Sequence, residues 1–127
     1  MNVLFSEVMI PVGQHMQIIG QTCKSVTLPE LYKQSNIISL HVPKTKETEG
    51  MVNKSMLNQL KKDAILINCS RGELVNEPEL IQHLKSSPEF KYGADVIRNE
   101  PSYGKGKVAF PFTDVKNVLI TCHIGAS

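Results

Sequence analysis

The segment Ile65-Leu-Ile-Asn-Cys-Ser-Arg71-Gly72 decides the fold class of this chain. It is a short apolar run that ends in polar residues and a glycine, as in a buried β-strand followed by a tight connection. Two later segments have the same form, Gly93-Ala-Asp-Val-Ile-Arg-Asn-Glu100-Pro and Asn117-Val-Leu-Ile-Thr-Cys-His123-Ile-Gly. Because helix signals alternate with such runs, the sequence predicts an α/β fold with a parallel sheet and right-handed crossovers.

The rest of the chain supplies the other elements of this pattern. Thr27, Asn53 and Asn76 are suited to cap helices, and the first of these helices is expected to end near Gln34. The apolar run 36–40 indicates a strand buried on both faces. Further strands are predicted at residues 3–6, 64–67, 92–96 and 118–120, and a loop at residues 101–111.

Length and composition limit the class of protein. The chain has 127 residues, of which 41% are hydrophobic and 20% charged, as in one small soluble domain. Fourteen Lys and Arg against twelve Asp and Glu leave a net charge of +2, which gives no electrostatic reason to expect a nucleic acid or an anionic membrane as partner. Three distant cysteines and the lack of a signal-like start favour a reduced, cytoplasmic protein.

Three residues with complementary chemistry follow the predicted strands. Arg71, Glu100 and His123 each come just after an apolar run, and ligands of open parallel sheets bind outside the carboxyl ends of the strands. A guanidinium, a carboxylate and an imidazole in one crevice can hold a carboxylate substrate and move a proton. Taken singly, a surface arginine, an exposed glutamate and a structural histidine are the ordinary interpretations.

Two other motifs were weighed for chemistry. Gly104-Lys-Gly-Lys-Val-Ala109 matches a dinucleotide-binding pattern, but no strand precedes it and Pro111 follows, so it is expected to be a loop. Asp95, inside an apolar strand, needs a hydrogen-bond donor, either a carboxamide of a ligand or an internal backbone amide. The spacing of His15, His41 and His83 predicts no metal site.

A series of short motifs occurs in a fixed order along nearly the whole chain: Leu28-Pro-Glu-Leu, Ile38-Ser-Leu-His-Val-Pro, Thr45-Lys-Glu-Thr, Gly50-Met, Ala64-Ile-Leu-Ile-Asn-Cys-Ser-Arg-Gly-Glu-Leu-Val, Ala94-Asp-Val, Asn99-Glu-Pro and Asn117-Val-Leu-Ile-Thr-Cys-His-Ile-Gly. As an ordered set, they resemble the nucleotide-binding domain of the D-isomer-specific 2-hydroxyacid dehydrogenases, and most of all the D-3-phosphoglycerate dehydrogenases among them. The resemblance implies NAD as cofactor and a small 2-hydroxy or 2-oxo acid as substrate.

The resemblance also implies roles for single residues. Arg71 would bind the substrate carboxylate, His123 would exchange the hydroxyl proton, and Glu100 would orient that imidazole and favour its protonated form. The implied contacts to the dinucleotide are Glu7 on the adenosine ribose, His41, Val42 and Pro43 near the adenine, Asp95 on the nicotinamide carboxamide, and Cys69, Ser70, Arg71, His123, Gly125 and Ala126 around the nicotinamide half.

Compared with this family, residues 1–127 are expected to be a partial dinucleotide-binding domain. The resemblance begins at the second strand of a doubly wound Rossmann-type sheet. On this resemblance we expect the first β-α unit with its glycine-rich loop and the substrate domain to be absent, and Glu7 stands where an aspartate is usual. We therefore expect a fragment of an NAD-dependent oxidoreductase for a D-2-hydroxy acid, with 3-phosphoglycerate as one candidate.

The isolated chain is expected to have little or no activity. Two alternatives stay open: a non-catalytic NAD-sensing module of the corepressor type, and an inactive truncated product. The full-length relatives imply a homodimer built through this domain.

Overall fold

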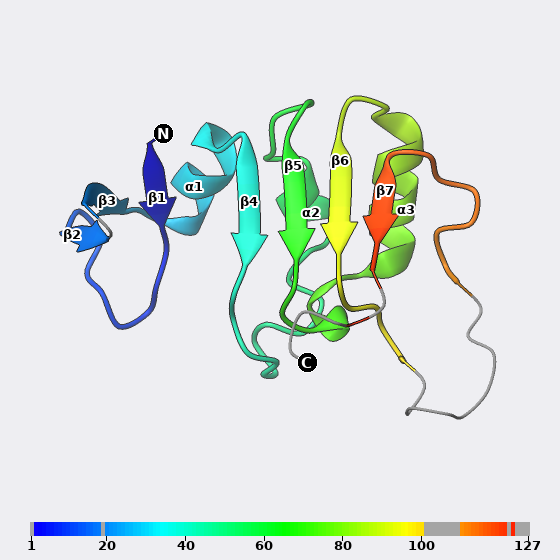
Figure 1. Ribbon diagram of the computed structural model, residues 1–127, viewed down its shortest axis with the longest axis horizontal. Helices are drawn as coiled ribbons and strands as arrows, with labels where there is room; N and C mark the ends of the chain where they lie inside the picture. The colour runs from blue at the N-terminus through cyan, green and yellow to red at the C-terminus, as the bar shows by residue number, and fades with distance from the viewer. Residues whose placement is uncertain (1, 19, 101–109, 122, 124–127) are drawn as a thin grey trace.

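The computed structural model describes residues 2–18, 20–100, 110–121 and 123. Strands and helices alternate along most of this length (Figure 1). In chain order the elements are β1 (Val3–Phe5), β2 (His15–Ile18), β3 (Gln21–Ser25), α1 (Leu28–Gln34), β4 (Ile37–Leu40), α2 (Lys54–Leu57), β5 (Ile65–Asn68), a 3-10 turn η1 (Gly72–Leu74), α3 (Glu77–Ser86), β6 (Lys91–Ala94) and β7 (Val118–Ile120).

The larger sheet has four parallel strands in the order β4-β5-β6-β7. Helices α2 and α3 both cover one face of this sheet (Figure 1), as right-handed crossovers in one direction require. The predicted α/β fold with a parallel sheet is confirmed. Because all four strands run the same way, their carboxyl ends meet at one edge.

A smaller sheet has the order β1-β3-β2, in which β1 runs parallel to β3 and β2 runs antiparallel to it. Among the described residues, β1 pairs only with β3, and β4 pairs only with β5. In the doubly wound order 3-2-1-4-5-6, strands 2 and 4 flank strand 1. β1 and β4 run in the same direction on the facing sides of the two sheets (Figure 1), and no described strand lies between them.

The hairpin formed by β2 and β3 was not predicted. Its register pairs His15 with Lys24 and Met16 with Cys23, and Gly20, with φ of +77°, lies in the turn. The sequence of both strands is mostly polar, so the apolar run that indicated the other strands is missing here. Residues 15–17 of β2 are exposed, and only Cys23 and Ser25 of β3 are buried, so neither strand needs a run of apolar residues.

All three predicted helix caps are confirmed. Thr27 forms a complete capping box, because its hydroxyl accepts from the amide of Glu30 and the Glu30 carboxylate accepts from the amide of Thr27. Asn53 and Asn76 each accept a hydrogen bond from the backbone amide three residues later, at 3.1 and 3.4 Å. Each helix therefore begins at the residue after its predicted cap.

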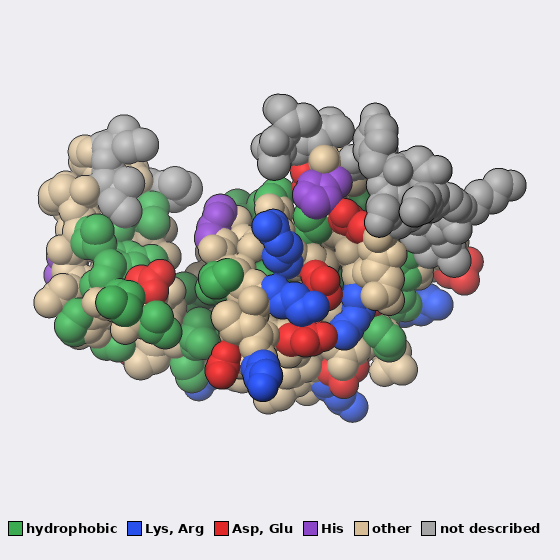
Figure 2. Space-filling model, turned by 90° about the horizontal axis from the view of Figure 1, so that it is seen from below, with side chains coloured by type: hydrophobic (Ala, Val, Ile, Leu, Met, Phe, Trp, Pro, Cys, Tyr) green, Lys and Arg blue, Asp and Glu red, His purple; other side chains and the backbone are tan. Residues whose placement is uncertain are grey.

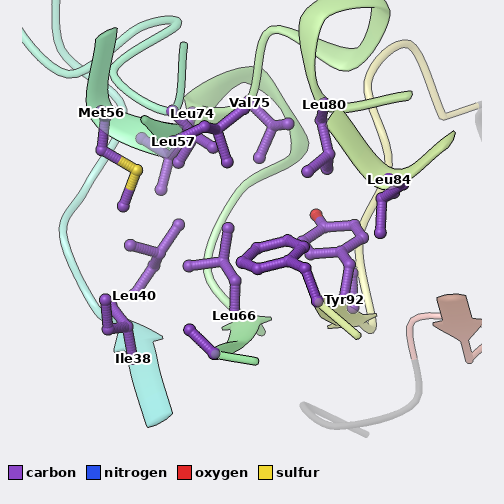
Figure 3. Close-up of a cluster of buried hydrophobic side chains, with 14 of the residues drawn as sticks. Ile38, Leu40, Met56, Leu57, Leu66, Leu74, Val75, Leu80, Leu84 and Tyr92 are labelled. Atoms are coloured by element: carbon purple, nitrogen blue, oxygen red, sulfur yellow. The ribbon is translucent and has the colours of Figure 1, made fainter. Parts of the chain in front are cut away.

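The main core lies between the four-stranded sheet and its helices (Figure 3). Leu66 at the centre of β5 is fully buried, and it faces residues of α2 and α3 such as Leu57 and Leu80. Burying each such side chain stabilises the fold by about 1.5–3 kcal/mol. The prediction that strand 36–40 is buried on both faces is wrong: exposed and buried residues alternate along β4, and Ile37 is 59% exposed. The helices cover one face only.

Candidate active site

The carboxyl ends of β5, β6 and β7 carry the three residues predicted to act in chemistry. Figure 2 looks onto this end of the molecule, where acidic, basic and histidine side chains lie close together over the four-stranded sheet. Arg71 follows β5, Glu100 follows β6 and His123 follows β7. The polarity of the sheet thus brings segments distant in sequence to one edge.

Glu100 and His123 are in direct contact. The Glu100 Oε2 and the His123 Nδ1 are 2.5 Å apart, and Glu100 Oε1 accepts from the backbone amide of Ile97 at 2.7 Å. An ionised carboxylate can only accept, so Nδ1 carries the hydrogen in this pair. The other ring nitrogen, Nε2, is then left for a ligand. His123 has φ of +54°, a left-handed conformation that is uncommon for a non-glycine residue and is often found at functional sites.

The loop after β5 is shaped by a residue that sequence reasoning missed. Asn68 is fully buried, its Nδ2 donates to the carbonyl oxygen of Arg71 at 2.9 Å, and its Oδ1 accepts from the amide of Ser70 at 3.1 Å. These two bonds close the loop and leave the Arg71 side chain exposed at the strand end. The Arg71 guanidinium donates only to the neighbouring Ser70 carbonyl oxygen among the described contacts, at 2.7 Å.

Gly72 brings the Arg71 loop against the Glu100 loop. The sequence indicated a tight connection at this glycine. Its backbone is not in the left-handed region; instead a Cβ placed here would lie 2.1 Å from the carbonyl carbon and oxygen of Ile97. Arg71 and Glu100 therefore lie on loops whose backbones are in contact, and His123 is hydrogen-bonded to Glu100.

The predicted adenine and nicotinamide residues also occupy this end of the sheet. The Ser70 hydroxyl donates to the carbonyl oxygen of Val42 at 2.6 Å, which ties the loop after β5 to the segment after β4. His41 Nε2 lies 2.9 Å from the Ser39 hydroxyl. Pro43 and Cys69 are exposed.

Asp95 is the one predicted site residue with a buried carboxylate. It is only 7% exposed, and the Thr121 hydroxyl donates to its Oδ1. The donor in this bond is a hydroxyl, which the sequence did not suggest. Thr121 was missed because nothing local marks a threonine at a strand end as a partner 26 residues away.

The remaining predicted residues lie elsewhere. Glu7 follows β1 in the smaller sheet, where its carboxylate accepts a 3.4 Å bond from the amide of Met9. Gly125 and Ala126 lie outside the described residues, as do Cys122 and the loop motif 104–109. Within the described ranges, no three His, Cys, Asp or Glu side chains are grouped as a metal site requires. No described helix has the length and apolar character to cross a membrane.

A cavity of about 640 Å³ lies at the opposite end of the strands. Its wall includes Leu84 and Tyr92 on one side and Val118 on the other, with three lysines at the rim: Lys85, Lys91 and Lys116. Size alone would make it a candidate ligand site. We favour the carboxyl ends, because the paired carboxylate and imidazole are there and because parallel sheets bind ligands at that edge.

Comparison with known proteins shows the family to which this chain belongs. Residues 1–125 match the family model described as D-isomer specific 2-hydroxyacid dehydrogenase, NAD binding domain. The chain is 39% identical over 104 residues to the glycerate dehydrogenase of Cucumis sativus, covering 82% of this chain and 26% of that protein. It is 34% identical over 105 residues to the D-3-phosphoglycerate dehydrogenase of Synechocystis sp., covering 83% and 18%.

A solved structure agrees with this assignment. The D-isomer specific 2-hydroxyacid dehydrogenase from Lactobacillus delbrueckii ssp. bulgaricus, in its NAD complexed form, superposes with a TM-score of 0.79 at 29% identity, covering 96% of this chain and 38% of that one. The chain spans about a quarter or less of the length of these two curated relatives. With its Rossmann-type sheet and NAD as the cofactor of its domain type, the chain belongs to the D-isomer specific 2-hydroxyacid dehydrogenase family and corresponds to the NAD-binding domain.

Proposed function

We propose that this chain provides the NAD-binding and proton-transfer half of an enzyme that interconverts a D-2-hydroxy acid and a 2-oxo acid. The observation that carries the proposal is the hydrogen bond between Glu100 and His123 beside the loop that bears Arg71. When bound, NAD supplies the redox chemistry. The residues of the chain bind and orient the acid and move its proton.

Arg71 would hold the carboxylate of the acid. Its guanidinium is exposed at the strand end and bonds only one neighbouring carbonyl oxygen among the described contacts, so most of its five donors are available. The planar fork matches a carboxylate with two parallel hydrogen bonds, and its charge persists at any working pH. A second cation would not be needed to fix the orientation of so small an acid.

His123 would exchange the hydroxyl proton at Nε2. The carboxylate of Glu100 holds the other nitrogen, which fixes the ring orientation and stabilises the imidazolium that forms when the proton is taken. Oxidation of a secondary alcohol releases one proton from the hydroxyl, and an imidazole is suited to accept it near neutral pH. In the reverse direction the imidazolium returns the proton to the carbonyl oxygen.

Several residues of the chain fit an NAD molecule at this edge. Asp95 is a buried acceptor beside Thr121, placed to take a carboxamide N–H donor of the nicotinamide. Glu7 offers an exposed carboxylate after β1, suited to the hydroxyls of a ribose and repelling a 2′-phosphate. The segments His41-Val42-Pro43 and Cys69-Ser70, joined by the Ser70 to Val42 bond, would contact the dinucleotide, as would Gly125 and Ala126, which lie outside the described residues.

The candidate substrates are the acids that appear in the names of the relatives: glycerate, glyoxylate, lactate and 3-phosphoglycerate. All share a carboxylate next to the reacting carbon, which is the part that Arg71 would bind. The remainder of each molecule differs in size and charge. We therefore propose that the site recognises the 2-hydroxy acid group that these substrates share. 3-Phosphoglycerate is one of these candidate substrates.

Titration of the purified chain with NADH, followed by nicotinamide fluorescence, tests the proposal. We expect saturable binding of NADH, weaker binding of NADPH, and a further change when a 2-oxo acid such as hydroxypyruvate is added. Arg71→Lys keeps the charge but loses the fork, so it should weaken 2-oxo acid binding by about 10-fold or more and change NADH binding much less. Lys91→Ala, a cation at the opposite strand ends, is the matched control and should change neither.

The outcomes separate the alternatives. Binding of NADH with no effect of any 2-oxo acid would favour the NAD-sensing module over the enzyme. Loss of 2-oxo acid binding in Lys91→Ala instead of Arg71→Lys would move the site to the cavity at the amino ends. A chain that binds neither nucleotide contradicts the proposal, provided that a cooperative melt shows that it is folded.

A further inference from the structure

The turn Ile97–Glu100 carries the carboxylate that holds His123. The Ile97 amide donates to Glu100 Oε1 at 2.7 Å, while Oε2 faces the imidazole at 2.5 Å, so one carboxylate links the turn to the ring. Asn99 has φ of +55°, a left-handed conformation that asparagine tolerates better than most residues. The position of the imidazole therefore depends on where the backbone of this turn lies.

Gly72 sets one side of that position. A Cβ at Gly72 would lie 2.1 Å from the carbonyl carbon and oxygen of Ile97 and 2.5 Å from the amide nitrogen of Arg98. These are backbone atoms, so no side-chain rotation can relieve the overlap, and the peptide between Ile97 and Arg98 would have to move. Gly72 directly follows Arg71, so this contact fixes the spacing between the guanidinium loop and the turn of Glu100.

Glu77 holds the same peptide from another side. Its Oε1 accepts from the amide of Arg98 at 2.7 Å, across 21 residues of sequence. Glu77 is the first residue of α3, where the helix dipole favours a carboxylate, and it is half-buried. Burial raises the pKa of Glu77 because desolvation disfavours its charge, and the hydrogen bond from Arg98 opposes that effect. Because a half-buried carboxylate loses part of its contact with water, the Glu77 carboxylate depends on its hydrogen bond from the Arg98 amide. This bond therefore constrains the position of that amide strongly.

The other link to this turn is weaker. The Arg98 guanidinium donates to Glu49 at 2.9 Å, but the two side chains are 36% and 42% exposed. Exposed ion pairs contribute little, since water screens them and both side chains lose freedom. Apart from the packing of the Ile97 side chain on the main core, Gly72 and Glu77 are thus the stronger of the described contacts that hold the backbone of this turn.

We propose that Gly72 and Glu77 are positioning residues that clamp the peptide between Ile97 and Arg98 and thereby keep the Glu100 carboxylate on the His123 imidazole, at a fixed spacing from Arg71. The inference rests on the proposed function, because the spacing matters for catalysis only if Arg71 and His123 act on the same acid. The clamp acts through the backbone, and neither residue needs to touch substrate or cofactor. It accounts for a buried glycine that is not in a left-handed conformation and for a half-buried carboxylate at the start of α3.

The tautomer of His123 reports directly on the clamp. In a neutral imidazole, a carboxylate on Nδ1 favours the Nδ1–H tautomer, and imidazole ¹⁵N shifts measured by NMR on the chain distinguish the two tautomers. We expect the Nδ1–H form to dominate in the wild type and to give way to the Nε2–H form in Glu77→Ala. Amide exchange at Ile97, whose acceptor is Glu100 and not Glu77, should accelerate by about 10-fold or more.

Two matched variants separate positioning from general destabilisation. Glu77→Gln keeps an oxygen that can accept from Arg98, so it should retain the wild-type tautomer. Glu79→Ala removes a carboxylate of the same helix that accepts from the amide of Lys54 instead, so it should leave His123 unchanged. Gly72→Ala should produce the largest loss of the Nδ1–H form, and Glu77→Ala carries the test if that variant does not fold.

An unchanged tautomer and unchanged Ile97 exchange in folded Glu77→Ala would overturn the inference, as would an equal effect of Glu79→Ala. Failure here is distinguishable from failure of the proposed function. If Glu77→Ala shifts the tautomer but the wild-type chain binds no NADH, the clamp stands and the proposed function falls. If the wild-type chain binds NADH but Glu77→Ala leaves the tautomer unchanged, the proposed function stands and the clamp falls.

Discussion

The two sheets of this chain differ in how they are stabilised. The four-stranded sheet and its helices supply the main buried cluster, with fully buried residues such as Leu57, Leu66 and Leu80. The three-stranded sheet buries Cys23 and Ser25 in its third strand, outside that cluster. Four large hydrophobic side chains are exposed on it or in the loop between β1 and β2: Val8 at 97%, Met9 at 84%, Val12 at 60% and Met16 at 40%. The strands of the larger sheet expose two, Ile37 at 59% and Leu119 at 70%.

This difference shows that hydrogen-bonded strands alone do not make a core. Both sheets are fully paired along their inner strands, but only the larger one has helices packed on a face (Figure 1). Figure 2 shows the same contrast, with hydrophobic side chains gathered on the smaller sheet and charged ones on the larger. The proposed chemistry of Arg71, Glu100 and His123 lies entirely on the better packed part, and only Glu7 lies on the other.

The largest expected effect comes from the core of the larger sheet. Leu66→Ala should lower the free energy of unfolding by about 3 kcal/mol, since Leu66 is fully buried and the site cannot collapse around the cavity left behind. Met16→Ala in the smaller sheet should cost less than about 0.5 kcal/mol, because that side chain is already 40% exposed. Urea denaturation of both variants measures the difference. Equal losses would mean that the two sheets share one core.

A smaller effect is expected at the cap of α3. Asn76→Ala removes the bond to the Glu79 amide and should lower the free energy of unfolding by about 1 kcal/mol, because α3 packs on the core through Leu80 and Leu84. Asn76→Ser, which keeps a capping oxygen, is the control and should lose only a few tenths of that. Thr27→Ala, at the cap of α1, should lower the free energy of unfolding by less, because α1 contributes one buried side chain to the core, Tyr32, and α3 contributes two. A loss as large as that of Asn76→Ala would contradict this ranking.

The smallest effect is a pH dependence. Burial lowers the pKa of His83, whose ring packs edge-on against Phe90 with centroids 4.8 Å apart. The folded chain therefore takes up this proton later than the unfolded chain as the pH falls. The contribution of His83 to stability is complete above about pH 6.5 and is lost as the pH falls from there toward its lowered pKa.

The loss should stay well below about 1 kcal/mol, since the imidazole is partly exposed. His83→Gln should flatten the pH profile of the urea midpoint below about pH 6.5 and leave it unchanged above. A slope that persists in the variant would assign the dependence to other groups.

Local sequence rules predicted the larger sheet well and the smaller one poorly. The caps at Thr27, Asn53 and Asn76 are confirmed because each depends on a side chain and a backbone amide three residues away. The β2–β3 hairpin was missed because its strands are polar, and the exposure of Ile37 was missed because a run of apolar residues does not say how many faces of a sheet are covered.

The candidate site divides in the same way. Arg71, Glu100 and His123 were found because each follows an apolar strand at the edge where ligands bind. Thr121 and Glu77 were not, since their importance comes from partners 26 and 21 residues distant.

The sequence by itself determined the order of the elements in the larger sheet, the helix starts and the edge of the sheet at which chemistry would lie, because these follow from caps, apolar runs and strand direction within short windows. Only the tertiary structure decided that Gly72 packs on the Ile97 carbonyl, that Glu77 accepts from the Arg98 amide, and that the strands form two sheets. Such contacts depend on the distance between backbones that are far apart in the chain, and no local pattern encodes that distance.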